Sequence, residues 1–230
     1  MSGVTAKFRW SSNGSDQPNR SRGTVDYALE KLINGPAGKH PFLDAIMRDA
    51  ATWAVPVFIA IVAAWFAVGW FRGSPRERLG STTALFAAGG ALLTNQLILL
   101  VWSRPRPFAA HPGTVHTLVA RSTDGSFPSD HALASMAIAV VLFHFHRRWG
   151  LAAIAAALLV CIARVYVGAH YPGDVAGGAL IGAIVASLLL GPLKVIPIRV
   201  SNGVTWLMRR LRLPLRDGSL PEAAGDRSPT

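Results

Sequence analysis

The chain has 230 residues, of which 51% are hydrophobic and 15% are charged, and its formal net charge is +11. A soluble domain of this length usually carries a larger share of charged residues. Its one cysteine, Cys161, excludes an intramolecular disulfide and a cysteine metal cluster. The composition therefore favours an integral membrane protein over a soluble protein with buried helices, which would have too little polar chain to cover its apolar segments.

The N-terminal 49 residues contain no long apolar segment. Residues 1–23 are rich in Ser, Asn, Gly and Arg, which predicts a disordered tail without a secretory signal. In residues 24–49, apolar residues recur at helical spacing with charged residues between them, and Gly35–Pro36 interrupts the pattern. We expect two short amphipathic helices at the membrane interface. A cap that packs on the helix bundle is an equally good interpretation.

The central part of the chain predicts an all-α membrane domain over residues 50–200. About 20 apolar residues span the hydrocarbon core of a bilayer. Only "HFHRRWG" separates the third and fourth apolar segments, so these two form an antiparallel hairpin. We find no internal repeat and no strand pattern. Five membrane-spanning helices are expected, at residues 50–70, 81–103, 131–147, 149–166 and 173–195.

Basic residues gather in connections that a five-span chain places on one side of the membrane. Three arginines occur in "FRGSPRERLG", two in "HRRW", and seven Lys or Arg from Lys194 onward. By the positive-inside rule this side is cytoplasmic, which makes residues 201–230 a basic, largely disordered cytoplasmic tail. The positive charge thus serves orientation and attraction to membrane lipids, and we expect no nucleic-acid partner.

The same topology brings distant ionisable residues to the outer end of the bundle. The third helix, from His131 to Arg147, is about 24 Å long, and the fourth returns over about 22 Å, so Arg164 lies level with His131. The loop before the third helix and the turn after the fourth face the same side. The residues expected to meet there are Arg104, Arg106, Ser129, Asp130, His131, Arg164, His170 and Asp174.

This set of residues suits a phosphate group. Arginine forks bind phosphate oxygens, and Ser129 or Asp130 would cap a helix whose N-terminus attracts anions. Asp174 lies four residues after His170, close enough to accept a hydrogen bond from the ring and leave the other ring nitrogen free as a nucleophile. His131 could then donate a proton to the leaving oxygen. Individually these residues also fit a helix cap, an interfacial arginine and a structural His–Asp pair.

Three motifs in this region resemble those of the type 2 phosphatidic acid phosphatase (PAP2) superfamily. The family patterns are K-x6-R-P, P-S-G-H and S-R-x5-H-x3-D. They correspond to "LLVWSRPRP", "PSDH" and "ARVYVGAHYPGD", which together cover about a third of the chain. Within this superfamily, the sequences "LINGPAG", "TNQLILLVWSRPRPF" and "SFPSDHA" are most similar to those of BcrC-type undecaprenyl-diphosphatases.

The resemblance implies a role for each matching residue. His170 would be the nucleophile that becomes phosphohistidine, Asp174 would orient it, and His131 would protonate the leaving group and later activate water. The phosphate would be bound by Arg106, Ser129 and Arg164, with Asp130 and Arg104 beside it.

The sequence departs from the family patterns at three positions. Leu99 stands where the family has lysine, Asp130 replaces the glycine of P-S-G-H, and Ala163 replaces the serine before Arg164. The missing lysine removes a positive charge from the expected phosphate site. Asn95 is a candidate substitute, although helix–helix hydrogen bonding is the commoner role of a polar residue in a membrane helix.

The function implied is that of a membrane lipid phosphatase that needs no metal or other cofactor. Undecaprenyl or another polyprenyl diphosphate is the first substrate candidate, for recycling the carrier lipid of cell-wall synthesis at the bacterial inner membrane, with the site on the extracytoplasmic side. Phosphatidic acid, phosphatidylglycerol phosphate and a polyprenyl-linked sugar phosphate are alternatives. A transporter or lipid-binding protein with an anion site is the rival from another class. A homo-oligomer is compatible with all of these.

Overall fold

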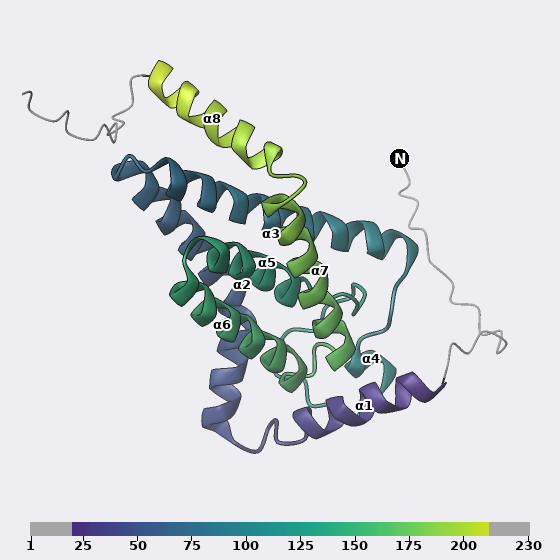
Figure 1. Ribbon diagram of the computed structural model, residues 1–230. Coiled ribbons are helices and arrows are strands. Elements are labelled where there is room, and N and C mark those ends of the chain that lie inside the picture. Colours follow the sequence, from purple (N-terminus) through teal and green to yellow (C-terminus); the bar gives the residue numbers. More distant parts are fainter. Residues whose placement is uncertain (1–19, 212–230) are drawn as a thin grey trace, which may run out of the picture.

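The computed structural model describes residues 20–211, and the regular secondary structure of this part of the chain is entirely helical. Of the tails expected at residues 1–23 and 201–230, residues 1–19 and 212–230 lie outside the described residues. Figure 1 shows the arrangement of eight helices: α1 (Arg20–Asn34), α2 (Pro41–Phe71), α3 (Pro75–Val101), α4 (Pro107–Ala110), α5 (Asp130–Phe145), α6 (Arg147–Tyr166), α7 (Pro172–Leu190) and α8 (Val195–Arg210).

Helix α5 is the centre of the bundle and packs against α2, α3, α6 and α7 (Figure 1). Ten of its sixteen residues are buried. Small residues let α7 approach it closely: a Cβ atom on Gly182 would lie 2.2 Å from the carbonyl oxygen of Leu133, and one on Gly178 would lie 2.6 Å from that of Ser129. Small residues four apart are a common way for membrane helices to pack. They fix the start of α5 against the start of α7.

The outer faces of the bundle are apolar, as expected for helices that face lipid. Helices α2, α3, α6 and α7 are long and apolar enough to cross a membrane, whereas α5 has 16 residues and lies inside the ring that they form. Large side chains point away from the protein, among them Leu93, Leu100, Trp149, Leu158 and Leu180. The prediction of an all-α membrane bundle is therefore confirmed, with four long spans around a shorter, buried fifth helix.

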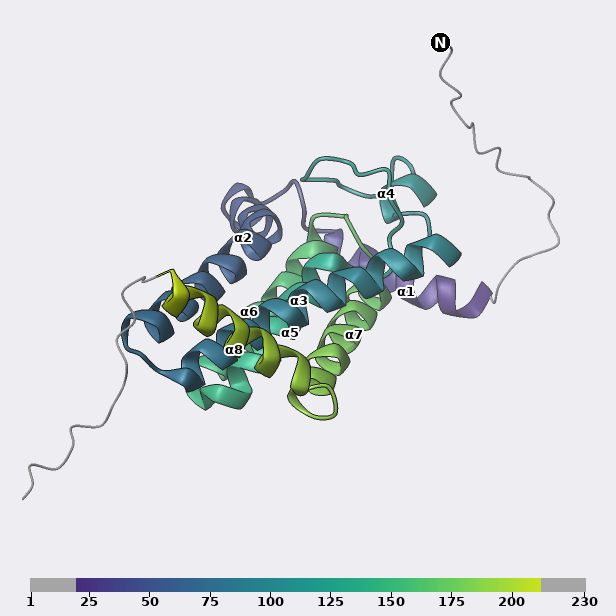
Figure 2. The same cartoon turned by 90° about the horizontal axis from the view of Figure 1, so that it is seen from above.

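The two ends of the bundle are crossed by the terminal helices, α1 at one end and α8 at the other (Figures 1 and 2). Residues 20–23 and 201–210, expected in the tails, belong to these helices. The expected second amphipathic helix is not a separate element. Pro41, whose fixed φ suits the first turn of a helix, begins α2, and the helix continues into the first span without interruption.

Helix α1 has a polar face that packs on the bundle. Glu30 and Asn34 are buried, and Asn34 donates hydrogen bonds to the carbonyl oxygens of Tyr166 (2.7 Å) and His116 (2.8 Å). The opposite face carries exposed apolar side chains, Val25, Leu29 and Leu32. The cap interpretation of this segment therefore describes its packing, while the apolar outer face fits contact with the membrane interface.

Candidate active site

The predicted site residues lie at the end of the bundle that α1 covers. Arg106 follows α3, Ser129 precedes α5, Arg164 lies in the last turn of α6, and His170 lies in the turn before α7. Two backbone contacts connect these segments. The Ser129 amide donates to the Asp174 carbonyl oxygen (3.1 Å), and the Ala169 amide donates to the Arg164 carbonyl oxygen (3.1 Å). The topology thus joins the starts of α5 and α7 to the end of α6.

His170 is fully buried and held in one orientation. Its Nδ1 atom lies 2.7 Å from the carbonyl oxygen of Ser126. A carbonyl oxygen can only accept, so Nδ1 carries the proton and Nε2 of the neutral ring is unprotonated. Nε2 faces the guanidinium groups of Arg164, at 3.2 Å, and Arg106, at 3.3 Å. Nε2 is therefore placed between two cations that suit a phosphoryl group.

The surroundings of His170 keep its ring neutral. Burial lowers the pKa of His170 well below the ordinary value, and the positive charges of Arg164 and Arg106 lower it further. The hydrogen bond to the Ser126 carbonyl and the charge of Asp130 act on this pKa in the opposite direction but are weaker. A ring that remains neutral is the form that a nucleophile needs.

Asp174 does not contact His170 in the way that the motif spacing suggests. Its Oδ2 atom is 3.9 Å from Nδ1 of His170, beyond hydrogen-bond distance. Oδ2 instead accepts hydrogen bonds from the Ser126 hydroxyl and from the Tyr171 amide (2.9 Å). The prediction that Asp174 orients the ring directly is replaced by an indirect arrangement: Asp174 fixes Ser126, and the Ser126 carbonyl fixes His170.

The two arginines beside His170 are buried and anchored. Arg106 donates from Nε to the Asp124 carbonyl oxygen (3.2 Å) and from Nη1 to that of Ala169 (3.3 Å). Arg164 donates from Nη1 to the carbonyl oxygen of Ala51 in α2 (3.4 Å), and its buried Nε has no partner. Anchored guanidinium groups need little reorganisation to bind an anion, and the free Nε of Arg164 is an unused donor.

The start of α5 supplies the second histidine. Ser129 occupies the N-cap position but makes no capping hydrogen bond, and its buried hydroxyl has no partner. His131 is 24% exposed, its buried Nδ1 atom has no hydrogen-bond partner, and it lies 3.7 Å from the carboxylate of Asp130. The first turn of a helix also offers unpaired backbone N–H groups. Ser129 and His131 therefore keep free polar groups at the start of α5, at the same end of the bundle as His170.

Arg104 is engaged by carboxylates. It forms ion pairs with Asp174 (2.9 Å) and with Asp26 of α1 (2.7 Å), and it stacks on the ring of Tyr171. Asp26 also accepts a hydrogen bond from the Gly173 amide (2.8 Å). The structure therefore assigns Arg104 to the support of Asp174 and the α7 start, and its expected contact with phosphate would require it to leave these partners.

The position of the missing family lysine is covered by a loop. The side chain of Leu99 lies against Gly125, where a Cβ atom would come within 2.7 Å of it. Asn95, the candidate substitute, is buried in α3, and its Oδ1 atom has no hydrogen-bond partner. In the described part of the chain, the Asn95 side chain forms no hydrogen bond with His170, Arg106 or Arg164. The cationic groups at Nε2 are thus the two arginines.

Several residues of the site carried no recognisable sequence signal. Ser126 supplies both the carbonyl for His170 and the hydroxyl for Asp174, and the Asp124 carboxylate lies 3.5 Å from Arg106. Asp26 reaches the site from a helix more than 70 positions away in sequence from Arg104. Within residues 25–211, we find no group of three His, Cys, Asp or Glu side chains that could hold a metal ion.

Comparison with known proteins identifies the family. Residues 80–191, which include all three motifs, match the PAP2 superfamily. Undecaprenyl-diphosphatase BcrC of Bacillus subtilis (strain 168) is 32% identical over 186 residues, which cover 78% of this chain and 93% of that protein. Bacitracin transport permease protein BcrC of Bacillus licheniformis is 34% identical over 156 residues, 68% of this chain and 74% of that protein.

Solved structures agree with this assignment. Aquifex aeolicus LpxE superposes with a TM-score of 0.61 and 26% identity over 72% of this chain and 94% of that chain. The PAP2 type phosphatidylglycerolphosphate phosphatase of Bacillus subtilis shares the fold, with a TM-score of 0.61 and 24% identity over 77% of this chain and 89% of that chain. The protein therefore belongs to the PAP2 superfamily and is a multi-pass membrane phosphoric ester hydrolase.

Proposed function

We propose that the protein hydrolyses a polyprenyl diphosphate, with undecaprenyl diphosphate as the preferred substrate, to the monophosphate and inorganic phosphate. The observation that carries the proposal is the unprotonated Nε2 atom of His170 between Arg106 and Arg164. The substrate class is supported by the relatives, whose names include undecaprenyl-diphosphatase in Bacillus subtilis and in Sulfolobus acidocaldarius.

In the first step, the lone pair of His170 Nε2 attacks the terminal phosphorus atom. The bond from phosphorus to the bridging oxygen breaks, and its electron pair leaves with the polyprenyl phosphate. His131 donates a proton to that oxygen as it departs. The product is a phosphohistidine at residue 170, whose Nδ1 proton remains hydrogen-bonded to the Ser126 carbonyl.

In the second step, water attacks the phosphohistidine. His131, now neutral, accepts a proton from the water as the new P–O bond forms, and the N–P bond breaks. Nε2 recovers its lone pair, and inorganic phosphate leaves. The two steps restore His131 and His170 to their starting protonation states, so one water molecule is consumed per turnover.

Charge on the transferring phosphoryl group is neutralised by protein groups. Arg106 and Arg164 flank Nε2, and the unpartnered hydroxyl of Ser129 and the N-terminus of α5 add further donors. Preorganised donors of this kind supply much of the rate enhancement in phosphoryl transfer. We therefore infer that catalysis does not require a divalent ion.

The orientation of the site in the membrane is also part of the proposal. The end of the bundle opposite His170 carries exposed arginines, Arg72, Arg76, Arg147 and Arg148. Such residues favour the cytoplasmic side, which places His170 at the extracytoplasmic face. The diphosphate headgroup of a lipid in the outer leaflet would reach the site there. The polyprenyl monophosphate that is released would then be available again as a carrier lipid for cell-wall synthesis.

A substrate panel tests the proposal. Purified protein in EDTA should release phosphate from undecaprenyl diphosphate faster than from phosphatidic acid, phosphatidylglycerol phosphate or a polyprenyl-linked sugar phosphate, and His170→Ala should abolish release. His144→Ala, a histidine at the other end of α5, is the matched control and should retain activity. Strict dependence on added Mg²⁺, or a higher kcat/KM for one of the other lipids, would contradict the proposal.

A further inference from the structure

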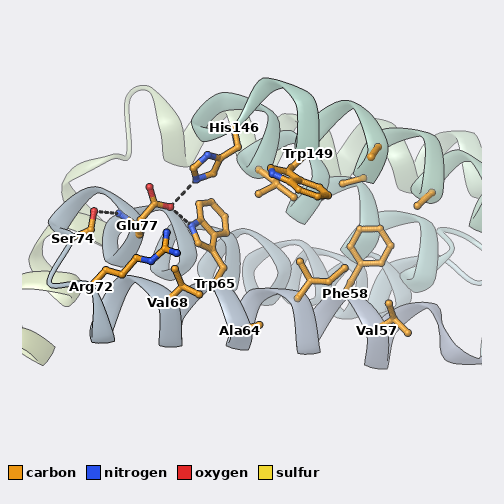
Figure 3. A pocket seen from close by; sticks show the side chains of 15 residues that line it. Val57, Phe58, Ala64, Trp65, Val68, Arg72, Ser74, Glu77, His146 and Trp149 are labelled. Atoms are coloured by element: carbon orange, nitrogen blue, oxygen red, sulfur yellow. Dashed lines mark hydrogen bonds and ion pairs between the residues drawn. The ribbon is translucent and has the colours of Figure 1, made fainter.

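A second candidate site lies at the end of the bundle away from His170. A groove of about 720 Å³ runs between α2 and α6, a volume typical of sites that take small molecules. Val57, Phe58 and Trp65 form its α2 wall, and Ala152, Ala153 and Ala156 form its α6 wall. Figure 3 shows its apolar part beside Val57 and Phe58 and its polar end at Glu77 and His146. Small side chains on α6 leave the space open.

The dimensions of the groove fit a hydrocarbon chain in one leaflet. From Val57 to Val68 the α2 wall extends about 16 Å, at about 1.5 Å per residue, which is about half of the 30 Å hydrocarbon thickness of a bilayer. Val57, Val68 and Trp149 are 51%, 41% and 73% exposed, so the groove opens on the outer surface of the bundle, where lipid is the solvent. Trp149 marks the interfacial end, a position that tryptophan favours.

The carboxylate at the polar end is held by two neighbouring side chains. Oε2 of Glu77 accepts hydrogen bonds from Trp65 Nε1 (2.5 Å) and lies 2.7 Å from His146 Nε2, as Figure 3 shows. These contacts tie the α2–α3 turn to the α5–α6 turn. The rings of Trp65 and His146 pack edge to face at this end of the groove, with 5.5 Å between their centroids.

Four exposed arginines lie in or beside the turns at this end of the groove. Arg72 lines the groove, Arg76 donates to the carbonyl oxygen of Phe145 (2.5 Å), and Arg147 and Arg148 separate two lining residues, His146 and Trp149. None of the four forms an ion pair with a carboxylate in the described part of the chain. An apolar groove that ends at unpaired arginines is complementary to a hydrocarbon chain attached to an anionic headgroup.

We propose that this groove binds a phospholipid with an anionic phosphate headgroup, from the leaflet opposite the His170 site. One hydrocarbon chain lies between α2 and α6, and the headgroup phosphate contacts Arg72 and its neighbouring arginines. The site is separate from the catalytic one, so it does not depend on the proposed function. Binding stabilises the pairing of α2 with α6, which also meet near His170, where Arg164 of α6 donates to the Ala51 carbonyl oxygen of α2.

Native mass spectrometry of the full-length protein tests the proposal with phosphatidylglycerol and phosphatidylcholine as probes. One phosphatidylglycerol should survive detergent removal at collision energies that strip phosphatidylcholine. Ala156→Phe, which fills the groove, should weaken retention roughly tenfold. Ala155→Phe is the matched control, because Ala155 is equally an exposed residue of α6 but does not line the groove. Circular dichroism would verify that both variants are folded.

The arginines are tested separately from the groove. Arg72→Gln combined with Arg148→Gln should reduce the preference for phosphatidylglycerol by roughly fivefold for each arginine removed, and should leave retention of phosphatidylcholine unchanged. Arg48→Gln, a 54% exposed arginine in the first turns of α2, is the control and should keep the preference. A preference that survives the double substitution would overturn the headgroup assignment.

A photoreactive phosphatidylglycerol with a mid-chain diazirine locates the bound chain. Crosslinks should map to residues 57–68 and 149–156, and they should disappear in Ala156→Phe but not in Ala155→Phe. Crosslinks spread evenly over the apolar surface would overturn the proposal. Dimers that persist in the spectrometer and dissociate in Ala156→Phe would also overturn it, because the occupant of the groove would then be a second copy of this chain.

Discussion

The imidazole of His170 donates its Nδ1 proton to the backbone carbonyl of Ser126, at 2.7 Å. This contact leaves Nε2 unprotonated, within hydrogen-bond distance of two guanidinium groups. The carboxylate of Asp174 does not contact the ring directly. It accepts hydrogen bonds from the Ser126 hydroxyl and the Tyr171 amide. A backbone acceptor cannot be removed by side-chain substitution, so the tautomer of His170 should survive changes that would destroy a direct His–Asp pair.

Substitution of Asp174 should therefore be less harmful than substitution of His170. His170→Ala should reduce kcat by at least about 10⁴-fold because the nucleophile is gone. Asp174→Asn should cost about 10- to 100-fold, the range typical of residues that act through another group. Phosphate release measured with both variants would check this order. Ser126→Ala keeps the backbone carbonyl, so its activity should be closer to that of Asp174→Asn than to that of His170→Ala. Equal inactivity of folded Asp174→Asn and His170→Ala would contradict the indirect arrangement.

The acidic limb of the pH profile of kcat/KM should lie below the ordinary pKa of histidine. His170 must be neutral to attack, and burial beside Arg164 and Arg106 lowers its pKa below the ordinary histidine value of about 6.5. Activity should thus persist as pH falls through 6.5, and should be lost at lower pH as His170 gains a proton. An acidic limb centred above 6.5 would contradict the neutral, buried His170.

Arg164 should require a guanidinium fork as well as a charge. Arg164→Gln should lower kcat/KM by about 10²- to 10³-fold, as removal of one preorganised donor does elsewhere. Arg164→Lys should recover only part of this loss, since lysine lacks the planar fork. Steady-state kinetics with Arg121→Gln as an exposed control arginine would check the effect. Full activity of Arg164→Lys would show that charge alone is needed.

Glu30 should make the stability of the protein fall as pH rises. The carboxyl group is buried in α1 without a hydrogen-bond partner, and burial together with Asp26 raises the pKa of Glu30 to about 7. Between the unfolded value of about 4.3 and the folded value, the folded protein holds a proton that the unfolded chain has released, so stability decreases with rising pH. The loss amounts to at most about 4 kcal/mol, since one pKa unit corresponds to about 1.4 kcal/mol.

Glu30→Gln should remove this dependence, and thermal unfolding in detergent at pH 5 and pH 8 would measure it. The variant should be more stable than the wild type at pH 8 and similar to it at pH 5. Asp49→Asn, at a 66% exposed position in α2, is the control and should keep the wild-type dependence. A wild-type unfolding temperature that does not fall between these pH values would contradict the account of Glu30.

Much of the site was predictable because sequence spacing and helix length fix positions along a bundle. The x5 and x3 spacings that separate Arg164, His170 and Asp174 correspond to the end of α6, one turn and the start of α7. The partner of His170 Nδ1 was not predictable. It is a backbone carbonyl in the loop before α5, and a carbonyl has no residue type to recognise. Asp26 was missed because its contact with Arg104 depends on where α1 crosses the bundle.

The sequence predicted the existence of the helices better than it predicted the residues at which they begin and end. The break at Gly35–Pro36 was predicted correctly, but Pro41 begins a helix that runs through the first span instead of a separate short one. The polar turns of α2 before Ala51 form part of this helix because they contact the bundle: Asp44 accepts a hydrogen bond from the Tyr166 hydroxyl (2.7 Å). The spacing of apolar residues along the sequence carries no information about tertiary contacts of this kind.

The most direct measurement is to trap the enzyme during turnover of a substrate labelled at the terminal phosphate and map the label after an alkaline quench that preserves phosphohistidine. The label should appear on His170 in the wild type, be absent from His170→Ala, and persist longer in His131→Gln, because removal of His131 slows the attack of water. Phosphate release by the wild type without any labelled protein, or a label on another residue, would contradict covalent catalysis by His170.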